Sequence, residues 1–262
     1  MSRLLSSLPI LFCAVPIASA LLAMPASAQT PTCAGPSNLN RLDQPLRRTG
    51  QRLAAGQALT IVAIGSSSTS GAGASSSAAS YPSRLEVELK ERFPTLTIRV
   101  LNRGVGGEEA ADMLARFDKA VFAEQPDLVL WQVGTNTVLR GHSLVTTESL
   151  IHEGVRRLKA GGPDLVLIDP QFAPKVIAKP DAESMVNFIS AEAKAENVNI
   201  FHRFAVMRHW HDDQQVPFEA FLSPDGLHMN DWSYACVAKL LAGAIDEAAT
   251  RASAVAGGPR RF

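Results

Sequence analysis

The feature that most constrains the fold of this chain is a series of five short runs of apolar and β-branched residues, each bounded by turn residues. Such runs are typical of buried strands. They are LTIVAI (59–64), LTIRVLN (96–102), DLVLWQV (127–133), DLVLID (164–169) and VNIFH (198–202). Strands that are apolar throughout, rather than alternating with polar residues, occur in parallel sheets covered by helices on both faces. The runs therefore predict a five-stranded, mainly parallel sheet.

Helical patterns lie between these predicted strands. Leu85, Leu89 and Phe93 are spaced four residues apart, Pro82 suits the first turn of a helix, and Pro94 stops it. Further helices are expected near residues 108–122, 146–160, 181–196 and 229–250. The alternation of strands and helices predicts an α/β fold, a three-layer α/β/α sandwich.

The first 28 residues have the features of an export signal. Residues 1–28 carry Arg3 near the start, then a Leu/Ile/Ala-rich stretch, and end in an A-x-A pattern at Ala28. We expect cleavage near Ala28 and a periplasmic or secreted product. A retained membrane anchor is the alternative, but two prolines in the stretch and the small residues at its end favour cleavage.

The remainder has the size of one domain. We expect an irregular lead-in with one short helix at 29–56, a single domain at 57–250 and a tail at 251–262. Lys and Arg total 25, and Asp and Glu also total 25, so the chain is close to neutral. This balance argues against nucleic acid and acidic membrane surfaces as partners, and no stable membrane insertion is expected after cleavage.

Two of the three cysteines would remain after cleavage. Cys13 would leave with the signal, and Cys33 and Cys236 would stay. An even number of cysteines in an exported chain indicates a disulfide, here from the N-terminal segment to the last predicted helix. Two buried thiols are the alternative, because the sequence gives no distance between them.

Polar and glycine-rich loops follow the predicted strands. In open parallel sheets, ligands bind beyond the carboxyl ends of the strands, near the point where strand order reverses. The loops are GSSST after the first strand, NRGVGGEE (102–109) after the second, VGTNT (133–137) after the third, and SPDGLH (223–228) before the final helix. We expect these four loops to converge at one edge of the sheet.

The four loops together resemble the sequence blocks of the GDSL, or SGNH, hydrolase superfamily. Gly65–Gly71 is similar to the first block, Gly-Asp-Ser-x-Thr-x-Gly, and Asn102–Gly107 is similar to the second, Asn-x-x-x-x-Gly. Gly134–Asn136 is similar to the third block, Gly-x-Asn, and Asp225–His228 to the fifth, Asp-x-x-His. The resemblance implies a flavodoxin-like sandwich and serine hydrolase activity without a cofactor.

The resemblance also implies a role for each of five residues. It makes Ser67 the nucleophile, His228 the base and Asp225 the carboxylate that orients the base. A serine hydroxyl is a poor nucleophile without a base, and the base must be held in the correct tautomer. Donors for the oxyanion of an ester intermediate would be the backbone N–H groups of Ser67 and Gly107 and the side-chain amide of Asn136. Each of these residues could instead be an ordinary helix cap or turn residue.

The match departs from the family pattern at two positions. Ser66 stands where the first block usually has Asp, and Thr137 stands where Asp often follows Asn136. Neither position carries the chemistry, so the departures bear on substrate choice and loop rigidity. Ser66 and Ser68 are alternative nucleophiles, but only Ser67 has the family's spacing to the neighbouring glycines and threonine.

Other chemical motifs fit less well. The segment around Ser67 lacks the G-x-S-x-G elbow, and neither a phosphate-binding loop nor a dinucleotide fingerprint is complete. The HWHDD segment offers His209, His211, Asp212 and Asp213, which could bind a metal or form a solvated loop. A structural site needs four ligands in a defined geometry, so no metal is expected.

The sequence therefore predicts an exported serine esterase acting on carboxylic esters. Short acyl groups such as acetyl on carbohydrate, or on small esters, are expected. Residues 71–80 and 203–224, with Trp210, Phe218 and Phe221, could wall an acyl pocket or could pack elsewhere. The alternatives are an O-acyltransferase acting on envelope polysaccharide and a non-catalytic protein that binds carbohydrate or another partner.

Overall fold

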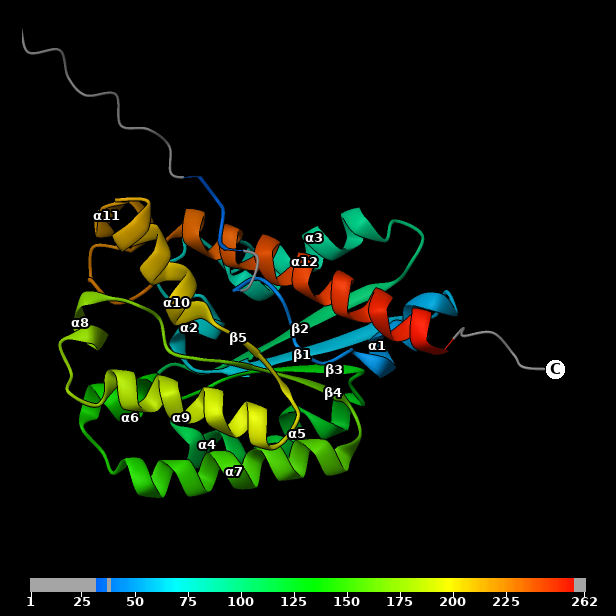
Figure 1. Cartoon of the computed structure of the whole chain (residues 1–262), viewed down its shortest axis with the longest axis horizontal. Coiled ribbons are helices and arrows are strands. Elements are labelled where there is room, and N and C mark those ends of the chain that lie inside the picture. The colour runs from blue at the N-terminus through cyan, green and yellow to red at the C-terminus, as the bar shows by residue number, and fades with distance from the viewer. Residues whose placement is uncertain (1–31, 37–38, 257–262) are drawn as a thin grey trace, which may run out of the picture. The chain divides into compact units, whose positions relative to one another are not determined.

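A parallel five-stranded sheet forms the centre of the molecule, as predicted. The computed structural model describes residues 32–36 and 39–256, with the strands in the order β2-β1-β3-β4-β5 (Figure 1). The strands are β1 (Leu59–Gly65), β2 (Ile98–Gly104), β3 (Leu128–Gln132), β4 (Asp164–Ile168) and β5 (Asn199–Phe201). All neighbouring pairs are parallel. Their five positions agree with the five apolar runs.

The strand order reverses beside β1. The chain passes from β1 to β2 on one side and then crosses to β3 on the other side of β1. Gly65 pairs with Gly104, and Ile64 pairs with Trp131, so the carboxyl ends of these three strands lie next to one another. Loops that follow them therefore meet at the position where open parallel sheets bind ligands.

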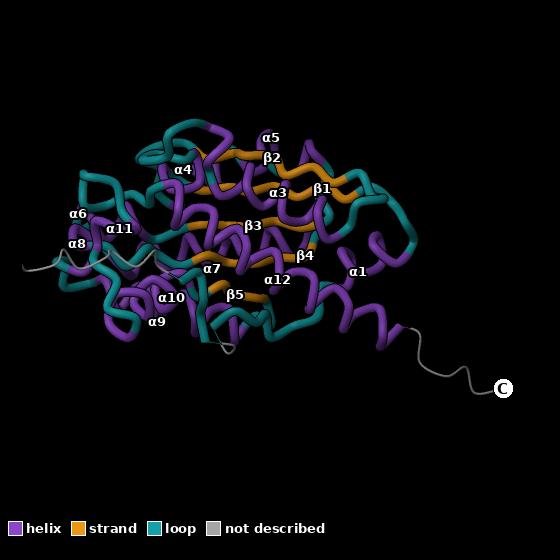
Figure 2. The backbone as a smooth tube through the Cα atoms, turned by 90° about the horizontal axis from the view of Figure 1, so that it is seen from above, coloured by secondary structure: helices purple, strands orange, loops and turns teal. Residues whose placement is uncertain are grey.

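Helices cover both faces of the sheet and complete the three-layer sandwich (Figures 1 and 2). On one face α3 packs against α12, which also contacts α1. On the other face α7 contacts α4 and α9. The bounds are α1 (Arg47–Ala54), α3 (Tyr81–Arg92), α4 (Ala110–Ala115), α5 (Phe117–Ala120), α7 (Leu144–Gly161), α9 (Ala182–Ala195) and α12 (Asp231–Ala256).

Several short helices lie in the connecting loops, most of them where no helix was predicted. They are α2 (Ser67–Ser70), α6 (Thr135–Arg140), α8 (Pro174–Ile177), α10 (Arg203–Arg208), α11 (Phe218–Phe221), the 3₁₀ helices η1 (Ser77–Ala79) and η2 (Phe122–Glu124), and the π-helix η3 (His209–Asp213). Most are too short to show an apolar period, so a sequence pattern does not reveal them.

Two predicted helix boundaries were wrong. The single helix expected at 108–122 is divided into α4, α5 and η2, and the first break falls at Arg116. There the guanidinium of Arg116 binds Glu108 and the carbonyl of Arg103, which joins the break to the loop after β2. The last helix, α12, continues to Ala256 and so includes the first six residues of the predicted tail.

The core between α7 and the sheet is closely packed. Trp131 is fully buried and meets the ring of Phe117 edge-on at 5.3 Å between centroids. A Cβ atom at Gly154 of α7 would lie 2.2 Å from the Trp131 ring. Glycine at this position therefore allows the helix to approach the indole.

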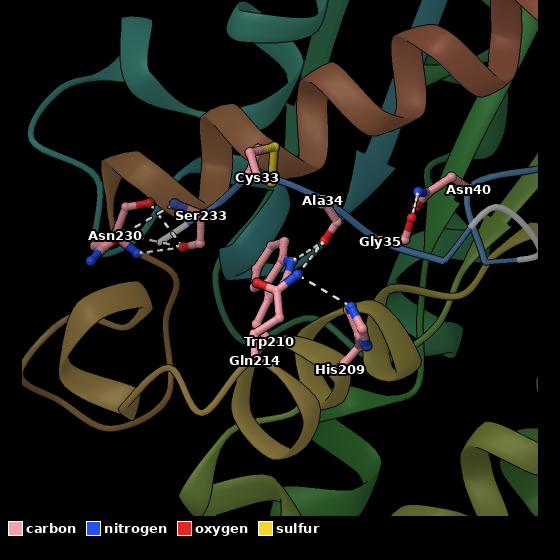
Figure 3. Close-up of a disulfide and its surroundings, with 10 residues drawn as sticks. Cys33, Ala34, Gly35, Asn40, His209, Trp210, Gln214, Asn230 and Ser233 are labelled. Carbon is pink, nitrogen blue, oxygen red and sulfur yellow. Dashed lines mark hydrogen bonds between the residues drawn. A yellow bond between two sulfur atoms is a disulfide. The ribbon is translucent and has the colours of Figure 1, made fainter. Parts of the chain in front are cut away.

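A disulfide fixes the N-terminal segment to the long last helix, and this prediction is confirmed (Figure 3). Cys33 is bonded to Cys236 of α12, with the two Cα atoms 5.4 Å apart. The indole Nε1 of Trp210 in η3 donates to the carbonyl of Ala34 at 3.0 Å, so the same segment is also bound to a loop helix. The predicted export signal, including Cys13, lies outside the described residues.

Within residues 32–36 and 39–256, the structure contains no helix that is both long and apolar enough to cross a membrane.

Candidate active site

Three side chains from two of the predicted loops form a continuous hydrogen-bonded relay. Ser67 is the first residue of α2, directly after β1, and its Oγ lies 2.9 Å from Nε2 of His228. The other ring nitrogen of His228, Nδ1, lies 2.5 Å from Oδ2 of Asp225. The structure therefore brings together a hydroxyl, an imidazole and a carboxylate from positions 161 residues apart.

The Asp225 carboxylate is held in place by its own loop. Its Oδ1 accepts hydrogen bonds from the Ser223 hydroxyl at 2.7 Å and from the backbone N–H groups of Leu227 and His228, each at 2.9 Å. Burial raises the pKa of the Asp225 carboxyl, but the hydrogen bonds from His228, Ser223 and Leu227 outweigh it and hold the pKa well below its usual range. An ionised Asp225 requires a proton on His228 Nδ1, which leaves Nε2 free to accept from the Ser67 hydroxyl.

The loop that carries His228 is closed at its base. The Ser223 N–H donates to the His228 carbonyl at 2.8 Å, and Leu222 and Met229 form a β-bridge. This tight loop leads directly into α12, which begins at Asp231. The imidazole and its carboxylate are thus presented on one short, closed turn.

Side chains from β2 and β3 hold the turn that carries Ser67. Gln132, at the end of β3, accepts through Oε1 from the Ser66 N–H at 2.9 Å and from the Ser66 hydroxyl at 3.0 Å. Asn102 in β2 donates to the Thr69 carbonyl at 2.9 Å. Sequence analysis missed Gln132, although a buried amide ending an otherwise apolar strand was a signal that could have found it.

Glycine is required where β2 meets this turn. A Cβ atom at Gly104 would lie 2.1 Å from the backbone nitrogen of Ser70. No side chain fits at that distance, so Gly104 allows the second loop to pack directly on α2. The requirement explains one of the glycines in the NRGVGG segment.

Hydrogen bonds to the residue after Gly107 hold the loop that follows β2. Gly107 has φ +81°, a left-handed conformation that favours glycine. The next residue, Glu108, accepts two hydrogen bonds from Arg116 Nε, at 2.8 and 2.9 Å, and its carbonyl accepts one from Asn136 Nδ2 at 2.8 Å. Two of the predicted oxyanion donors, Gly107 and Asn136, are thereby placed on adjoining loops.

Glu109 adds a second connection between the same two loops. Its carboxylate accepts from Arg140 Nη1 at 2.5 Å, from Thr137 Oγ1 at 3.1 Å, and lies 3.1 Å from His142 Nδ1. Burial raises the pKa of Glu109, but the hydrogen bonds from Arg140, His142 and Thr137 outweigh it and lower the pKa. Thr137, which departs from the family pattern, therefore has a structural role in this chain.

The two alternative nucleophiles are engaged elsewhere. The Ser66 hydroxyl is buried and donates to Gln132, as described above. The Ser68 hydroxyl is also buried and accepts from Arg203 Nη1 at 2.8 Å. Of the three consecutive serines, Ser67 is the one whose hydroxyl meets the His228 imidazole.

The HWHDD segment forms the π-helix η3, and its two histidines have different partners. His209 Nδ1 lies 2.6 Å from Asp213 Oδ2. His211 stacks on Phe218, with ring centroids 3.9 Å apart, and its Nδ1 lies 3.0 Å from the Val216 carbonyl. The segment supplies packing and local hydrogen bonds.

A different group of ligand-type side chains lies between α7 and α9. The ligand atoms of His152, Glu192 and Glu196 are within 4.8 Å of one another. Lys159 Nζ already lies 2.6 Å from Glu196 Oε2, so a lysine ammonium supplies positive charge at this cluster.

A pocket of about 480 Å³ borders the His228 loop. Its lining comprises Gly73, Pro174, Phe218, Glu219, Leu222, Ser223, Pro224, Gly226 and Asn230. Residues 71–80 and 203–224 thus both contribute residues to this pocket. Trp210 and Phe221 do not line it, because both are fully buried in the core.

The chain matches the Non-GDSL lipase-like family over residues 32–251, and it belongs to that family. The family's description agrees with the first block, where Ser66 replaces the Asp of the GDSL motif. The expectation of a GDSL protein is corrected in that respect.

Several known proteins with similar sequence or structure are esterases. An acetylxylan esterase from Geobacillus stearothermophilus is 39% identical over 56 residues, which are 21% of this chain and 26% of that enzyme. A two-domain esterase (CEX) active on acetylated mannans, co-crystallised with mannopentaose, has a TM-score of 0.70 and 21% identity, covering 83% of this chain and 58% of that one. A catalytic mutant of Axe2, an acetylxylan esterase from Geobacillus stearothermophilus, has a TM-score of 0.62 and 20% identity, covering 71% and 94%. At these identities the solved structures show the fold alone.

Proposed function

We propose that this protein is an SGNH-type serine esterase that hydrolyses carboxylic esters through an acyl-enzyme on Ser67. The observation that carries the proposal is the relay from Ser67 Oγ through the His228 imidazole to the Asp225 carboxylate. The esterase activity of the similar proteins supports the same reaction class.

The proposed reaction follows from the relay. Ser67 Oγ attacks the ester carbonyl carbon while His228 Nε2 takes the hydroxyl proton, and Asp225 stabilises the imidazolium. The N–H groups of Ser67 and Gly107 and the Asn136 amide bind the oxyanion. The intermediate collapses as His228 returns the proton to the departing alcohol, leaving the acyl group on Ser67.

Water completes the cycle in a second half-reaction. His228 Nε2 takes a proton from water as its oxygen attacks the acyl carbon. Collapse of the second intermediate breaks the bond to Ser67 Oγ, which regains the proton from His228. The products are one carboxylic acid and one alcohol, and the enzyme returns to its starting state.

We propose acetyl groups on carbohydrate as the substrate class. The proteins similar in sequence or fold act on acetylated xylan and acetylated mannans. The pocket beside the His228 loop has Phe218 as an apolar wall and Glu219 and Asn230 as polar groups, a combination suited to a sugar ring.

Hydrolysis by the Ser67→Ala variant tests the nucleophile assignment. We expect release of p-nitrophenol from p-nitrophenyl acetate, and of acetate from acetylated xylo- and manno-oligosaccharides, to fall at least 1,000-fold. Ser76→Ala is the matched control, because Ser76 is an exposed serine nine residues along the same segment. Unchanged hydrolysis by Ser67→Ala would refute the proposal.

Further outcomes separate the alternatives. Failure of the parent protein to hydrolyse any of these esters or to react with a fluorophosphonate would favour a non-catalytic binding protein. Transfer of acetyl to an added oligosaccharide in preference to water would identify an O-acyltransferase.

Rates across p-nitrophenyl esters from acetyl to palmitoyl are expected to fall with chain length.

We also propose that the protein is exported. The Cys33–Cys236 disulfide supports this, because such bonds persist in oxidising compartments. The N-terminal sequence of the protein recovered from outside the cytoplasm is expected to begin at Gln29. Recovery with residues 1–28 intact would indicate a retained anchor.

A further inference from the structure

Two buried polar side chains lie beneath the candidate active site and outside the relay. Arg203, the first residue of α10, is 0% exposed, and Gln171, which follows β4, is 1% exposed. Arg203 Nη2 donates to Gln171 Oε1 at 3.1 Å, and Arg203 Nε and Nη2 donate to the Asp169 carbonyl at 3.0 and 2.7 Å. We call the side chains of Gln171 and Arg203 the hub.

The hub makes one contact with each of three separate loops. Arg203 Nη1 donates to the Ser68 hydroxyl at 2.8 Å, and Gln171 Oε1 accepts from the Thr135 hydroxyl at 3.1 Å. Gln171 Nε2 donates to the Leu227 carbonyl at 3.4 Å. These three contacted residues immediately precede or follow the proposed catalytic residues Ser67, Asn136 and His228.

The backbone ladders of the sheet do not extend into these loops. The ladder between β1 and β3 ends at the Ile64–Trp131 pair, before either loop begins. Leu222 and Met229, at the base of the His228 loop, pair with each other in an isolated β-bridge outside the five strands. Side-chain contacts therefore contribute to the distances between the three loops, and the hub contacts all three.

Folding stability alone does not require a guanidinium in this position. Removing a charge from water is costly, and buried ionic groups can often be replaced by apolar residues of similar volume without loss of stability. The bonds of Arg203 to the Asp169 carbonyl use two of its five N–H donors, and the contact to Ser68 uses a third. A role in placing the nucleophile turn explains the contact to Ser68.

We propose that Gln171 and Arg203 are positioning residues that hold the nucleophile, the oxyanion amide and the base at fixed distances from one another. The inference rests on the proposed function, because it assigns Ser67, Asn136 and His228 their roles. The hub acts through Ser68, Thr135 and Leu227 and touches no reacting atom. Displacement of a catalytic group by about 1 Å can lower a rate by about 100-fold, so small losses of register are measurable.

The test removes one hub contact at a time. Ser68→Ala removes the acceptor for Arg203, and Thr135→Val removes the hydroxyl that binds Gln171 while keeping its volume. Gln171→Met removes both loop contacts of Gln171, whereas Gln171→Glu keeps the acceptor for Thr135 and Arg203. Thr49→Val is the matched control, since Thr49 is a fully buried threonine of α1 whose N–H binds Asp164 at the opposite end of the sheet.

The readouts are kcat and KM for p-nitrophenyl acetate, the rate of fluorophosphonate labelling, and the melting temperature. We expect Gln171→Met to lower kcat about 10- to 100-fold with KM within about threefold of the parent. Ser68→Ala and Thr135→Val should each lower kcat about 3- to 30-fold by the same loss of register. Labelling should slow in parallel, and Gln171→Glu should regain most of the rate.

The inference is overturned if kcat is unchanged in Gln171→Met, Ser68→Ala and Thr135→Val. It is also overturned if kcat in these three variants falls only in proportion to the folded fraction, as we expect for Thr49→Val. If Gln171→Met does not fold, the two milder variants decide the matter alone. Failure of the hub would leave Ser67→Ala inactive, whereas failure of the proposed function would leave Ser67→Ala active.

Discussion

Replacing Asn136 with alanine separates a catalytic role of its amide from a structural one. Asn136 is the second residue of α6 and donates one amide N–H from Nδ2 to the Glu108 carbonyl at 2.8 Å. The second N–H of the same amide remains for an oxyanion. Alanine would remove both donors but would preserve the helix, because alanine is the best helix former.

The catalytic role predicts a loss of kcat, and the structural role predicts a loss of folding stability. Loss of one oxyanion donor costs about 100- to 1,000-fold in kcat, or about 2.7–4 kcal/mol of transition-state stabilisation. Loss of the bond to Glu108 costs about 1 kcal/mol of folding stability, which lowers the melting temperature of a domain of this size by about 2–4 °C. We therefore expect a severe loss of rate in a protein that remains folded.

The assay measures kcat and KM on p-nitrophenyl acetate beside thermal unfolding. The Asn136→Asp variant sharpens the comparison, because its carboxylate has the same shape but would repel both the oxyanion and the Glu108 carbonyl. The expected order of kcat is the parent, then Asn136→Ala, then Asn136→Asp. A kcat for Asn136→Ala within threefold of the parent, or a rise in KM alone, would contradict the oxyanion role.

Three further variants address the loop, the disulfide and a titrating pair. Gly107→Ala should lower kcat at least tenfold on p-nitrophenyl acetate, because a side chain is strained at φ +81° and would shift the N–H; an unaltered kcat would argue against this donor. Replacing Cys33 and Cys236 with serine should lower the free energy of unfolding by about 3–5 kcal/mol in denaturant titrations, since the bond closes a loop of about 200 residues; an equal stability would contradict this. The Asp169 carboxylate, 3.8 Å from His202 Nδ1, raises the pKa of His202 despite burial, so the stabilisation from this pair is complete below about pH 6.5 and is lost as pH rises through the folded-state pKa. The melting-temperature difference between the parent and His202→Gln should therefore be larger at pH 6 than at pH 9, and a constant difference would refute the pairing.

The sheet could be predicted from the sequence because each strand is an unbroken apolar run between turn residues. The same reasoning failed for the helix expected at 108–122. Its period of apolar residues continues through Arg116, but the contacts of Arg116 with Glu108 and the Arg103 carbonyl form only in the folded protein. Short helices such as α6 and α10 were missed because six residues show too little of a period.

The site residues could be predicted because the loops after three strands and the loop before the last helix resemble the sequence blocks of the SGNH superfamily. Ser67, Asn136 and His228 could be selected in that way, and the structure places two of them in direct contact. The supporting residues could not be selected from the sequence. Gln171 and Arg203 lie 32 positions apart and follow different strands, so their meeting depends on the packing of β4, β5 and α10.

The most direct test of the account is to locate the site of covalent modification by a fluorophosphonate. The labelled protein would be digested, and the modified peptide would be sequenced by tandem mass spectrometry. The relay predicts a single stoichiometric adduct on Ser67, and none in the His228→Ala variant, which lacks the base. An adduct on Ser66, on Ser68 or on any residue outside this turn would contradict it.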